Sequence, residues 1–373
     1  MKFIDLNKQY QKIKNNINKD LLKTLEKGDF IQGKDVFELE NKLADYVGTN
    51  ECITCASGTD ALLIPLMAYG IGKGDAVFTT NFSFFATTEV ISLVGAKPIF
   101  IDINPSTYNI NAELLEDEIK LVIKEKKFKP KAIIAVNLFG QLADYTKIEK
   151  IAKKYNLILI EDAAQSFGAT LKDKVSCSFG NISATSFYPA KPLGCYGDGG
   201  AIFTDDIVLA KKCRSLKVHG QGFDKYDNVR IGLNSRLDTL QANVLINKLS
   251  IFNQELLSRN KIALFYTDRL KDTLKTPYVC EGFMSSWAQY SLMANSLKER
   301  DLLLKHLNSK NIPTAIFYKK IFSDLELYKN DNLNRVYPVA SSVSKKIFSI
   351  PMHPYLEQKE LKSIVNAIKE FYR

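Results

Sequence analysis

Between Glu51 and Leu216 the chain alternates short apolar runs with amphipathic stretches, and the connections between them are short. The apolar runs predict strands at 76–80, 98–102, 132–137, 157–160, 182–187 and 200–204. The amphipathic stretches predict helices at 59–70, 84–94, 112–125, 144–155 and 206–216. Regular alternation of this kind implies a mostly parallel sheet that is covered by helices on both faces. We therefore expect an α/β fold for this part of the chain.

Apolar residues at helical spacing also mark the flanking parts of the chain. Amphipathic helices are expected at 9–27 and 36–46, and a long helix begins near Asp238. Beyond about residue 260 the pattern becomes mixed α+β, with a strand-like segment at 288–294, a helix at 298–309, the segment 312–318 and a closing helix at 360–372. With a length of 373 residues, this indicates two closely packed domains, a large one at 1–250 and a smaller one at 251–373.

The charge pattern gives no sign of a nucleic-acid or membrane partner. The formal net charge is +10, but the lysines are spread through the predicted helices and form no basic stripe interleaved with aromatic residues. The N-terminus lacks the apolar core of a signal peptide, and no apolar run reaches membrane-spanning length. We therefore expect a cytoplasmic protein that binds neither nucleic acid nor a membrane and whose positive charge suits anionic substrates.

The six cysteines are scattered along the chain, which favours reduced thiols over a disulfide framework. Cys52 and Cys55 form a CxxC pair, but neither a second pair nor a histidine cluster accompanies them to complete a zinc site. We interpret the two residues as core thiols of a strand and expect no metal.

One lysine has an unusual setting. Lys191 follows the apolar run 182–187, lies between Pro189 and Pro192, and precedes four glycines that end at Gly200. This setting places the lysine on a shaped loop and not on a solvated helix face. Taken alone, it fits an ordinary surface lysine as well as a functional one.

A second stretch upstream favours a functional role for Lys191. The apolar run Leu157 to Ile160 ends in Glu161 and Asp162, which predicts a buried parallel strand with a carboxylate at its C-terminal end. Ligands of open α/β sheets bind at that end of the strands. A loop lysine and a buried aspartate are the pair that pyridoxal phosphate needs, because the lysine forms a Schiff base and the carboxylate keeps the pyridine nitrogen protonated. The two stretches together indicate a pyridoxal phosphate site.

Two further stretches fit such a site. The turn Ser57-Gly58-Thr59 joins an apolar run to an apolar helix, and unpaired N–H groups at a helix N-terminus favour phosphate. Ordinary helix capping by the two hydroxyls is the alternative interpretation. An aromatic cluster that includes Phe84 follows the predicted strand 76–80, where a ring could stack on a planar cofactor; core packing is the alternative there.

Taken together, these stretches resemble the sugar-nucleotide aminotransferases of the DegT/DnrJ/EryC1/StrS family, which are fold type I pyridoxal phosphate enzymes. The matching motifs run in order through nearly the whole chain: Phe3 to Leu6, Ser57 to Leu62, Gly95 to Pro98, Asp102 to Asn109, Leu138 to Gln141, Glu161 to Gly168, Ser186 to Gly200, His219 with Gly220, Gly232 to Asp238, and Leu240 to Ala242. One motif would be weak, but the ordered set is highly specific. The resemblance implies a large domain with a mostly parallel sheet covered by helices and a smaller C-terminal α+β domain.

The resemblance also implies a role for individual residues. Lys191 would be the Schiff-base lysine and proton shuttle, and Asp162 would pair with the pyridine nitrogen. The other implied cofactor contacts are Gln165 at the phenolic oxygen, Phe84 on the ring, and Ser57, Gly58, Thr59 and Ser186 at the phosphate. Asn234 matches a position that reaches the phosphate from the neighbouring subunit, so a homodimer with two shared sites is expected.

The implied reaction moves the amino group of L-glutamate to a keto-sugar linked to a nucleotide. The likeness is greatest to the 3-aminotransferases of UDP-2-acetamido-2-deoxy-3-oxo sugars, and His219 is among the expected substrate contacts. In members that use a 3-oxo-glucuronate, the counterpart of Arg236 meets the sugar carboxylate together with a histidine and a tyrosine. This chain keeps Arg236 and Tyr318 but has Phe317 at the histidine position. Because an unpaired buried charge is costly, we expect the neutral UDP-2-acetamido-2-deoxy-3-oxo-glucose, which would give a 2,3-diamino sugar of the kind used in lipid A.

Other substrates and functions stay open at this point. The sugar alternatives are the 3-oxo-glucuronate, a dTDP-linked 3-oxo-6-deoxyhexose and 4-oxo sugars. A pyridoxamine-dependent dehydratase of the same fold would have a histidine in place of Lys191. A non-catalytic cofactor-binding regulator would need a DNA-binding extension, and a plain nucleotide-binding module would need a phosphate loop; the sequence has neither.

Overall fold

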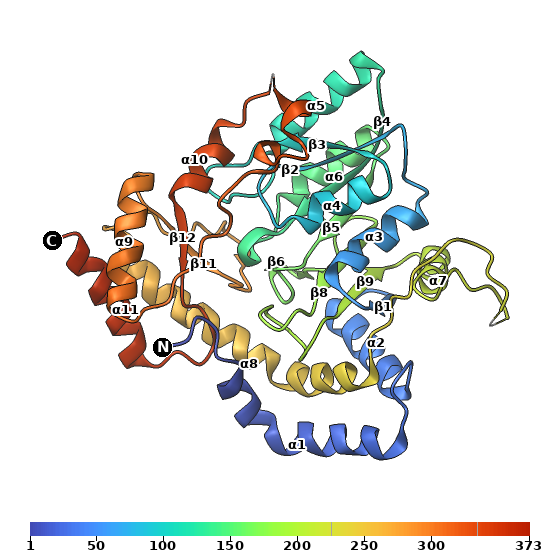
Figure 1. Cartoon of the computed structure of the whole chain (residues 1–373), viewed down its shortest axis with the longest axis horizontal. Helices are drawn as coiled ribbons and strands as arrows, with labels where there is room; N and C mark the ends of the chain where they lie inside the picture. The colour runs from blue at the N-terminus through green and yellow to red at the C-terminus, as the bar shows by residue number, and fades with distance from the viewer. Residues whose placement is uncertain (225, 334) are drawn as a thin grey trace.

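The computed structural model describes residues 1–224, 226–333 and 335–373 (Figure 1). A seven-stranded sheet lies at the centre. Its strands are β1 (Glu51–Cys55), β2 (Asp75–Thr80), β3 (Lys97–Ile101), β4 (Lys129–Val136), β5 (Ile158–Asp162), β8 (Ile182–Ser186) and β9 (Gly200–Thr204). Their order is β1-β9-β8-β5-β4-β2-β3, and β9 runs antiparallel to both of its neighbours while the other neighbouring pairs are parallel. The expected mostly parallel sheet is confirmed.

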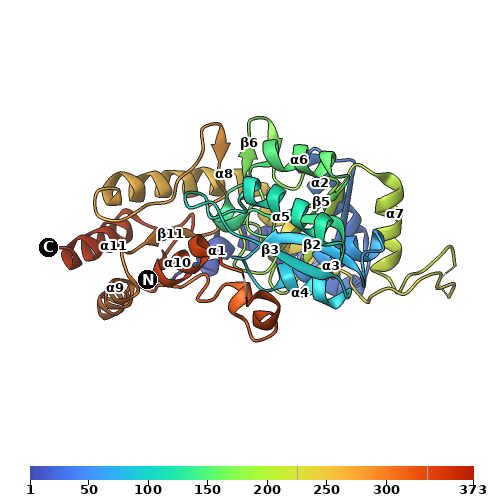
Figure 2. The ribbon, with the colours of Figure 1, turned by 90° about the horizontal axis from the view of Figure 1, so that it is seen from above.

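Helices cover both faces of this sheet. They are α3 (Gly58–Ala68), α4 (Ala86–Leu93), α5 (Ala112–Glu125), α6 (Tyr145–Lys154) and α7 (Ile207–Leu216). Neighbouring residues of a strand point to opposite faces. Ile134 therefore packs in a cluster with side chains of α3, α4 and α7, whereas Ile133 packs in a cluster with side chains of α5 and α6. Figure 2 shows α6 above and α4 below β2.

Three further helices pack beside β1 and β9: α1 (Leu6–Lys27), α2 (Lys34–Val47) and the first half of α8 (Thr239–Leu270). The first of them has clear ends, because Asp5 Oδ1 accepts the N–H groups of Asn7 and Lys8 and Gly28 closes the helix with φ of 69°. Figure 1 shows α1 running alongside α8. The long helix predicted from Asp238 is confirmed.

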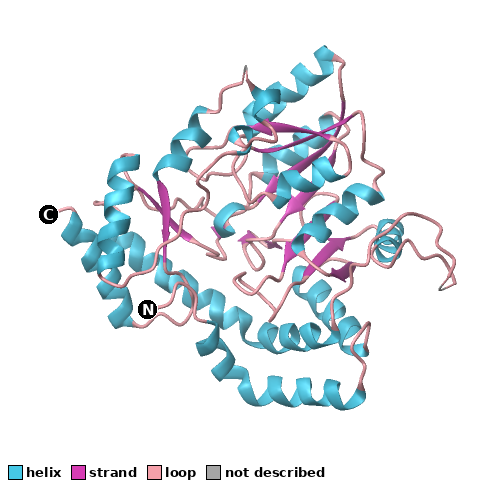
Figure 3. Cartoon of the chain, viewed as in Figure 1, coloured by secondary structure: helices cyan, strands magenta, loops and turns pink. Residues whose placement is uncertain are grey.

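The C-terminal part forms a second, smaller α+β unit, as expected. β11 (Tyr290–Met293) and β12 (Ile347–Ile350) pair antiparallel, and α9 (Leu297–Ser309), α10 (Pro338–Lys346) and α11 (Gln358–Phe371) surround them. Figure 3 shows this pair of strands apart from the central sheet. A third small sheet joins β10 (Phe283–Met284) to β6 (Thr170–Leu171) and β7 (Lys174–Val175). Short 3-10 helices lie at Leu138–Gly140, Phe322–Asp324 and Lys329–Asn332.

The predicted domain boundary at residue 250 falls inside α8. Side chains from Ala242 to Leu256 pack in a cluster with α1 and α2, whereas those from Ile262 to Leu270 pack in the cluster of the C-terminal unit. One continuous helix therefore spans the predicted boundary, and the division at 250 stays a prediction. In the described part of the chain, no helix is long and apolar enough to cross a membrane.

Candidate active site

The C-terminal end of β5 holds a buried carboxylate. Asp162 is the last residue of this strand and is 4% exposed. Its Oδ2 accepts a hydrogen bond of 2.8 Å from the Thr87 hydroxyl, and its Oδ1 accepts one of 3.2 Å from the Ala164 N–H. Burial raises the pKa of Asp162, while these donors and the positive charge of Lys191 oppose that rise. The two donors and the nearby cation therefore favour the ionised form of Asp162 against the effect of burial.

Lys191 lies on the loop that connects β8 to β9. The backbone N–H of Lys191 donates to the Tyr188 carbonyl at 2.9 Å, which closes a turn just before the lysine side chain. Burial lowers the pKa of Lys191, and the charge of Asp162 partly offsets this effect. The fold therefore brings the loop lysine and the strand aspartate together, and a lowered pKa leaves more of the amine unprotonated at neutral pH, which is the form that acts as a nucleophile and a base.

The turn between β1 and α3 packs against the ends of β8 and β9. A Cβ atom on Gly58 would lie 2.5 Å from the Ser186 Cβ, and one on Gly200 would lie 2.3 Å from the Ser57 carbonyl oxygen. The Ser57 hydroxyl caps α3 by accepting the Asp60 N–H at 3.1 Å. The Ser57 hydroxyl therefore acts as a helix cap, and its own O–H remains a possible donor to a phosphate. The N–H groups of Gly58 and Thr59 have no carbonyl one turn earlier in the helix, so they suit an anion such as phosphate.

Gln165 links the 3-10 helix Leu138–Gly140 to the segment of Tyr318 at this site. Its Oε1 accepts the Phe139 N–H at 2.8 Å, and its Nε2 donates to the Tyr318 hydroxyl at 3.1 Å. The Tyr318 ring lies near Phe84, with 6.3 Å between the ring centroids, and burial raises the pKa of this tyrosine so that it stays neutral. Phe84 is 56% exposed, which leaves its ring accessible to a ligand. Phe317 is half-buried and packs against the Phe3 ring with 6.3 Å between centroids.

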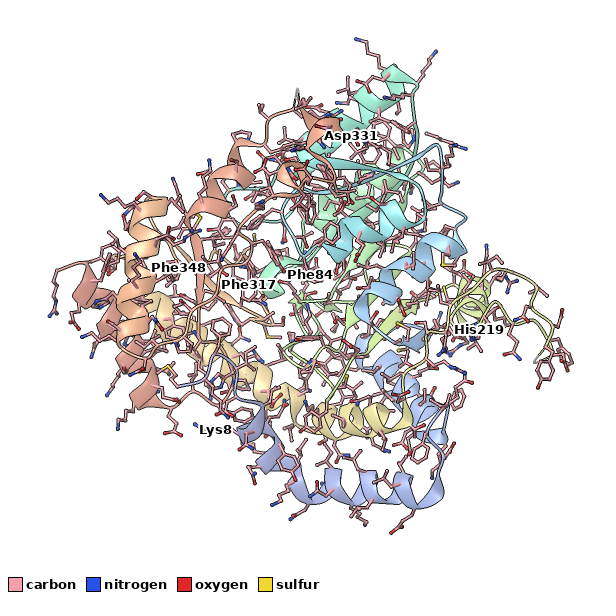
Figure 4. All side chains as sticks on the ribbon, in the orientation of Figure 1. Lys8, Phe84, His219, Phe317, Asp331 and Phe348 are labelled. Atoms are coloured by element: carbon pink, nitrogen blue, oxygen red, sulfur yellow. The ribbon has the colours of Figure 1, made fainter. Side chains whose placement is uncertain are left out.

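Three expected site residues, Asn234, Arg236 and His219, are not part of the cluster around Tyr318. Asn234 is exposed, and its Oδ1 accepts a hydrogen bond of 2.6 Å from Arg236 Nη2. His219 and Arg236 line a surface cavity of about 970 Å³. Figure 4 shows His219 beside α7, well separated from Phe84 and Phe317. Within one chain, the structure therefore does not bring His219 to the cluster around Tyr318.

Two further residues that touch this site were not predicted as site residues, although Ser235 lies within the motif Gly232 to Asp238. Thr87, at the start of α4, holds Asp162. Ser235 is fully buried and donates to Asp60 Oδ2 at 2.6 Å, and its Oγ accepts the Ala56 N–H at 3.2 Å. This serine ties the segment of Asn234 to the first turn of α3. In the sequence, the only signals for these two hydroxyl residues were their positions: Ser235 follows Asn234 directly, and Thr87 lies three residues after Phe84.

Similarity to known proteins extends over the whole chain. Residues 11–369 match the DegT/DnrJ/EryC1/StrS aminotransferase family. The chain is 43% identical over 369 residues to a UDP-2-acetamido-2-deoxy-3-oxo-D-glucuronate aminotransferase of Pseudomonas aeruginosa, with 99% of each chain covered. It is 33% identical over 370 residues to a UDP-N-acetyl-3-dehydro-α-D-glucosamine 3-aminotransferase of Acidithiobacillus ferrooxidans, with 98% of this chain and 96% of the relative covered.

Solved structures of related proteins share this fold. A DegT/DnrJ/EryC1/StrS aminotransferase from Brucella abortus superposes with a TM-score of 0.97 at 47% identity, covering 100% of this chain and 99% of the other. Solved structures of related aminotransferases hold pyridoxal phosphate or its pyridoxamine form.

The residues present fit this cofactor. The open N-terminus of α3 suits a phosphate, and the lack of a side chain at Gly58 lets it lie against Ser186. Asp162 is a buried acceptor, and Lys191 is a nearby amine with a lowered pKa. The chain therefore belongs to the DegT/DnrJ/EryC1/StrS aminotransferase family and is a pyridoxal-phosphate-dependent sugar aminotransferase.

Proposed function

We propose that this enzyme transfers the amino group of L-glutamate to the 3-oxo carbon of UDP-2-acetamido-2-deoxy-3-oxo-glucose. The product would be a 2,3-diamino sugar nucleotide for a surface glycan such as lipid A. The observation that carries the choice of a neutral sugar is the aromatic side chain of Phe317 next to Tyr318, where a partner for a sugar carboxylate is expected in the family.

The roles of the residues follow from their positions. Pyridoxal phosphate, when bound, supplies an electron sink for the carbon that loses or gains the proton. Lys191 holds the cofactor and then moves the proton as a free amine, because burial keeps its pKa below the usual value. Asp162 presents a negative charge to the pyridine nitrogen, and Thr87 keeps that carboxylate oriented.

The other contacts hold the cofactor in place. The N–H groups of Gly58 and Thr59 and the hydroxyl of Ser186 face the phosphate in this proposal. The exposed ring of Phe84 would pack on the pyridine. The second N–H of the Gln165 amide, which has no acceptor among the described residues, would meet the phenolic oxygen while the first binds Tyr318.

We propose that the active unit is a homodimer with two shared sites. Asn234 and Arg236 lie together on the outer side of their own chain, so each would reach the site of the partner subunit. The same segment exposes large apolar side chains at Phe223, Val229 and Ile231, which suits a protein interface better than solvent.

The pocket chemistry favours the neutral sugar. Phe317 offers no hydrogen-bond donor, and its ring is already packed between Tyr318 and Phe3. A sugar carboxylate placed there would lose hydration without a second donor to replace it. A neutral hydroxymethyl group carries no such cost.

The 3-oxo-glucuronate is the second candidate. Arg236 forms no salt bridge within the described residues, so its guanidinium is available to a carboxylate or to the UDP phosphates. The Pseudomonas relative acts, by its name, on the uronate.

Substrate half-reactions distinguish the two sugars. The purified protein is first treated with glutamate, and the synthetic neutral or uronate 3-oxo sugar nucleotide is then added while the visible absorbance is followed. We expect the neutral sugar to restore the yellow colour faster. The variant Phe317→His should gain rate with the uronate, because a histidine supplies the missing donor. Faster recovery with the uronate in the unmodified protein would overturn the neutral assignment.

We also infer a cytoplasmic setting, because five of the six cysteines are buried and all six are free thiols.

A further inference from the structure

A second lysine, Lys248, is buried beneath the loop that carries Lys191. It lies in the first half of α8, and its side chain is 0% exposed. Its Nζ donates to the Gly194 carbonyl at 2.5 Å and lies 4.2 Å from the centroid of the Tyr196 ring. Both partners belong to the loop between β8 and β9. Lys248 forms no salt bridge with a carboxylate in the part of the chain that the structure describes.

Gly194 connects Lys248 to the turn that presents Lys191. A Cβ atom on Gly194 would lie 2.6 Å from the Tyr188 carbonyl oxygen and 2.7 Å from that of Pro189, so the glycine backbone is stacked directly on this turn. The Tyr188 carbonyl in turn accepts the Lys191 N–H at 2.9 Å. A shift of the Gly194 carbonyl therefore moves the backbone of the catalytic lysine.

The same helix face holds the loop at a second point. Gln241 Oε1 accepts the Tyr196 N–H at 2.8 Å. Gln241 and Lys248 are seven residues apart, which is about two helical turns, so both side chains project from one face of α8. The glutamine holds the far part of the loop, whereas the lysine holds the part that touches the turn of Lys191.

Stability alone does not explain a lysine at this position. Burial lowers the pKa of Lys248 to about 8, and only the charges of Glu255 and Cys195 oppose that shift. A methionine has nearly the same length and fills such a space without the desolvation cost of a buried ammonium. What methionine lacks is the positively charged donor that faces the Gly194 carbonyl.

We propose that Lys248 is a positioning residue for Lys191: its ammonium fixes the Gly194 carbonyl and thereby holds the Lys191 turn in the orientation that faces Asp162. This inference rests on the proposed role of Lys191 as the lysine that holds the cofactor. Lys248 is not among the residues proposed to contact the cofactor or the sugar.

The test uses the cofactor-loaded enzyme with the substitution Lys248→Met. We expect the thermal midpoint to stay equal or rise, because a buried charge is removed. The maximal rate constant of the glutamate half-reaction should fall about tenfold, with little change in the glutamate concentration that gives half of that rate, as for the loss of one hydrogen bond to a charged group. The pH at which the visible absorbance changes should also shift, and amide hydrogen exchange at 187–197 should become faster. Lys261→Met, an exposed lysine of the same helix, is the matched control.

Two results would overturn the proposal. One is a Lys248→Met protein with the half-reaction rate constant, the absorbance titration and the loop exchange of the Lys261→Met control. The other is a joint loss of stability and activity in Lys248→Met that persists in Lys248→Gln, although glutamine keeps a neutral donor. Partial recovery of the absorbance titration by Lys248→Gln supports the donor role. A Lys191→Ala protein that stays yellow would instead contradict the proposed cofactor lysine, so the two failures are distinguishable.

Discussion

The Thr87 hydroxyl donates a 2.8 Å hydrogen bond to Oδ2 of Asp162, across 75 residues of sequence. This donor opposes the effect of burial, which raises the pKa of the carboxyl group. Removing the donor should raise that pKa further, so that more of the carboxyl is protonated and less negative charge faces the cofactor.

We therefore predict that Thr87→Val lowers kcat/KM about tenfold, in line with the loss of a hydrogen bond to a charged group. The acid limb of the pH profile should move to higher pH, because the weakened carboxylate takes up its proton earlier. Thr88→Val, next to it in α4, is the matched control. Steady-state rates between pH 5 and 8 provide the measurement, and an unmoved acid limb would count against the role of Thr87.

Lys191→Ala should abolish both the yellow colour of the purified protein and the transfer of the amino group. Lysine is needed to hold the cofactor and to move the proton, and alanine does neither. The exposed Lys150 provides a control as Lys150→Ala, which should stay yellow. Absorbance spectra of the two proteins, prepared with added pyridoxal phosphate, decide the matter. An unchanged spectrum for Lys191→Ala would falsify the assignment.

Gly58→Ala should weaken cofactor binding and lower stability. The new Cβ atom would lie 2.5 Å from the Ser186 Cβ, so the turn and the end of β8 must separate. Overpacking of this kind costs about 1–3 kcal/mol. Gly72→Ala, where the nearest atom is the Val94 carbonyl oxygen at 3.3 Å, is a milder control. Equilibrium dialysis with pyridoxal phosphate and urea unfolding measure the two effects; equal behaviour of the two variants would contradict the prediction.

Local sequence signals predicted the elements that carry the main site residues. The apolar run before Asp162 defines β5 because a strand buried on both faces needs continuous apolar residues. The helix ends at Gly28 and Ser57 follow from capping preferences. These features depend on a few neighbouring residues, so they can be read from the sequence.

Contacts between distant segments could not be predicted in this way. Thr87 meets Asp162, and Lys248 meets Gly194, only because the fold brings separate elements together. The strand β12 was missed because its four residues, three of them apolar, are too few to give a distinguishable period. The sequence also left the Ser57 hydroxyl undecided between cap and phosphate ligand; the hydrogen bond from Asp60 shows the cap, and the phosphate contact stays a prediction.

The buried His353 should make the protein less stable as the pH falls. Its pKa is lowered from 6.5 to about 4 by burial and by the charge of Arg259, while Asp5 and Glu360 oppose this shift. Between these two pH values the unfolded chain binds a proton that the folded chain does not. The free energy of unfolding should therefore decrease by roughly 3 kcal/mol from pH 6.5 to 4 through this group.

The substitution His353→Gln isolates this effect. Urea unfolding between pH 4 and 7 should show a flatter dependence of stability on pH in this variant than in the unmodified protein. His219→Gln, at an exposed position, should keep the original slope. If His353→Gln keeps that slope too, the acid sensitivity has another origin.

Asn234 gives the most direct test of shared active sites. In the proposed dimer, each site combines Lys191 of one chain with Asn234 of the other. Asn234→Asp places a negative charge where the phosphate is bound, so it should inactivate the enzyme while preserving the size of the side chain. Lys191→Ala inactivates it through the other half of the site.

Mixing the two inactive proteins, after dissociation and reassociation, should therefore restore activity. A mixed dimer contains one site with both substitutions and one site with neither. Random pairing makes about half of the dimers mixed, so about a quarter of the original activity should return. If each chain instead formed its site alone, every site would keep one substitution and no activity would return.

The double variant Lys191→Ala/Asn234→Asp mixed with the unmodified protein is the control. Its mixed dimers carry one substitution in each site, so activity should fall below that of the unmodified protein alone. Sedimentation of each mixture verifies that dimers have formed. Restored activity would thus identify Asn234 as a residue that acts in the site of the partner subunit.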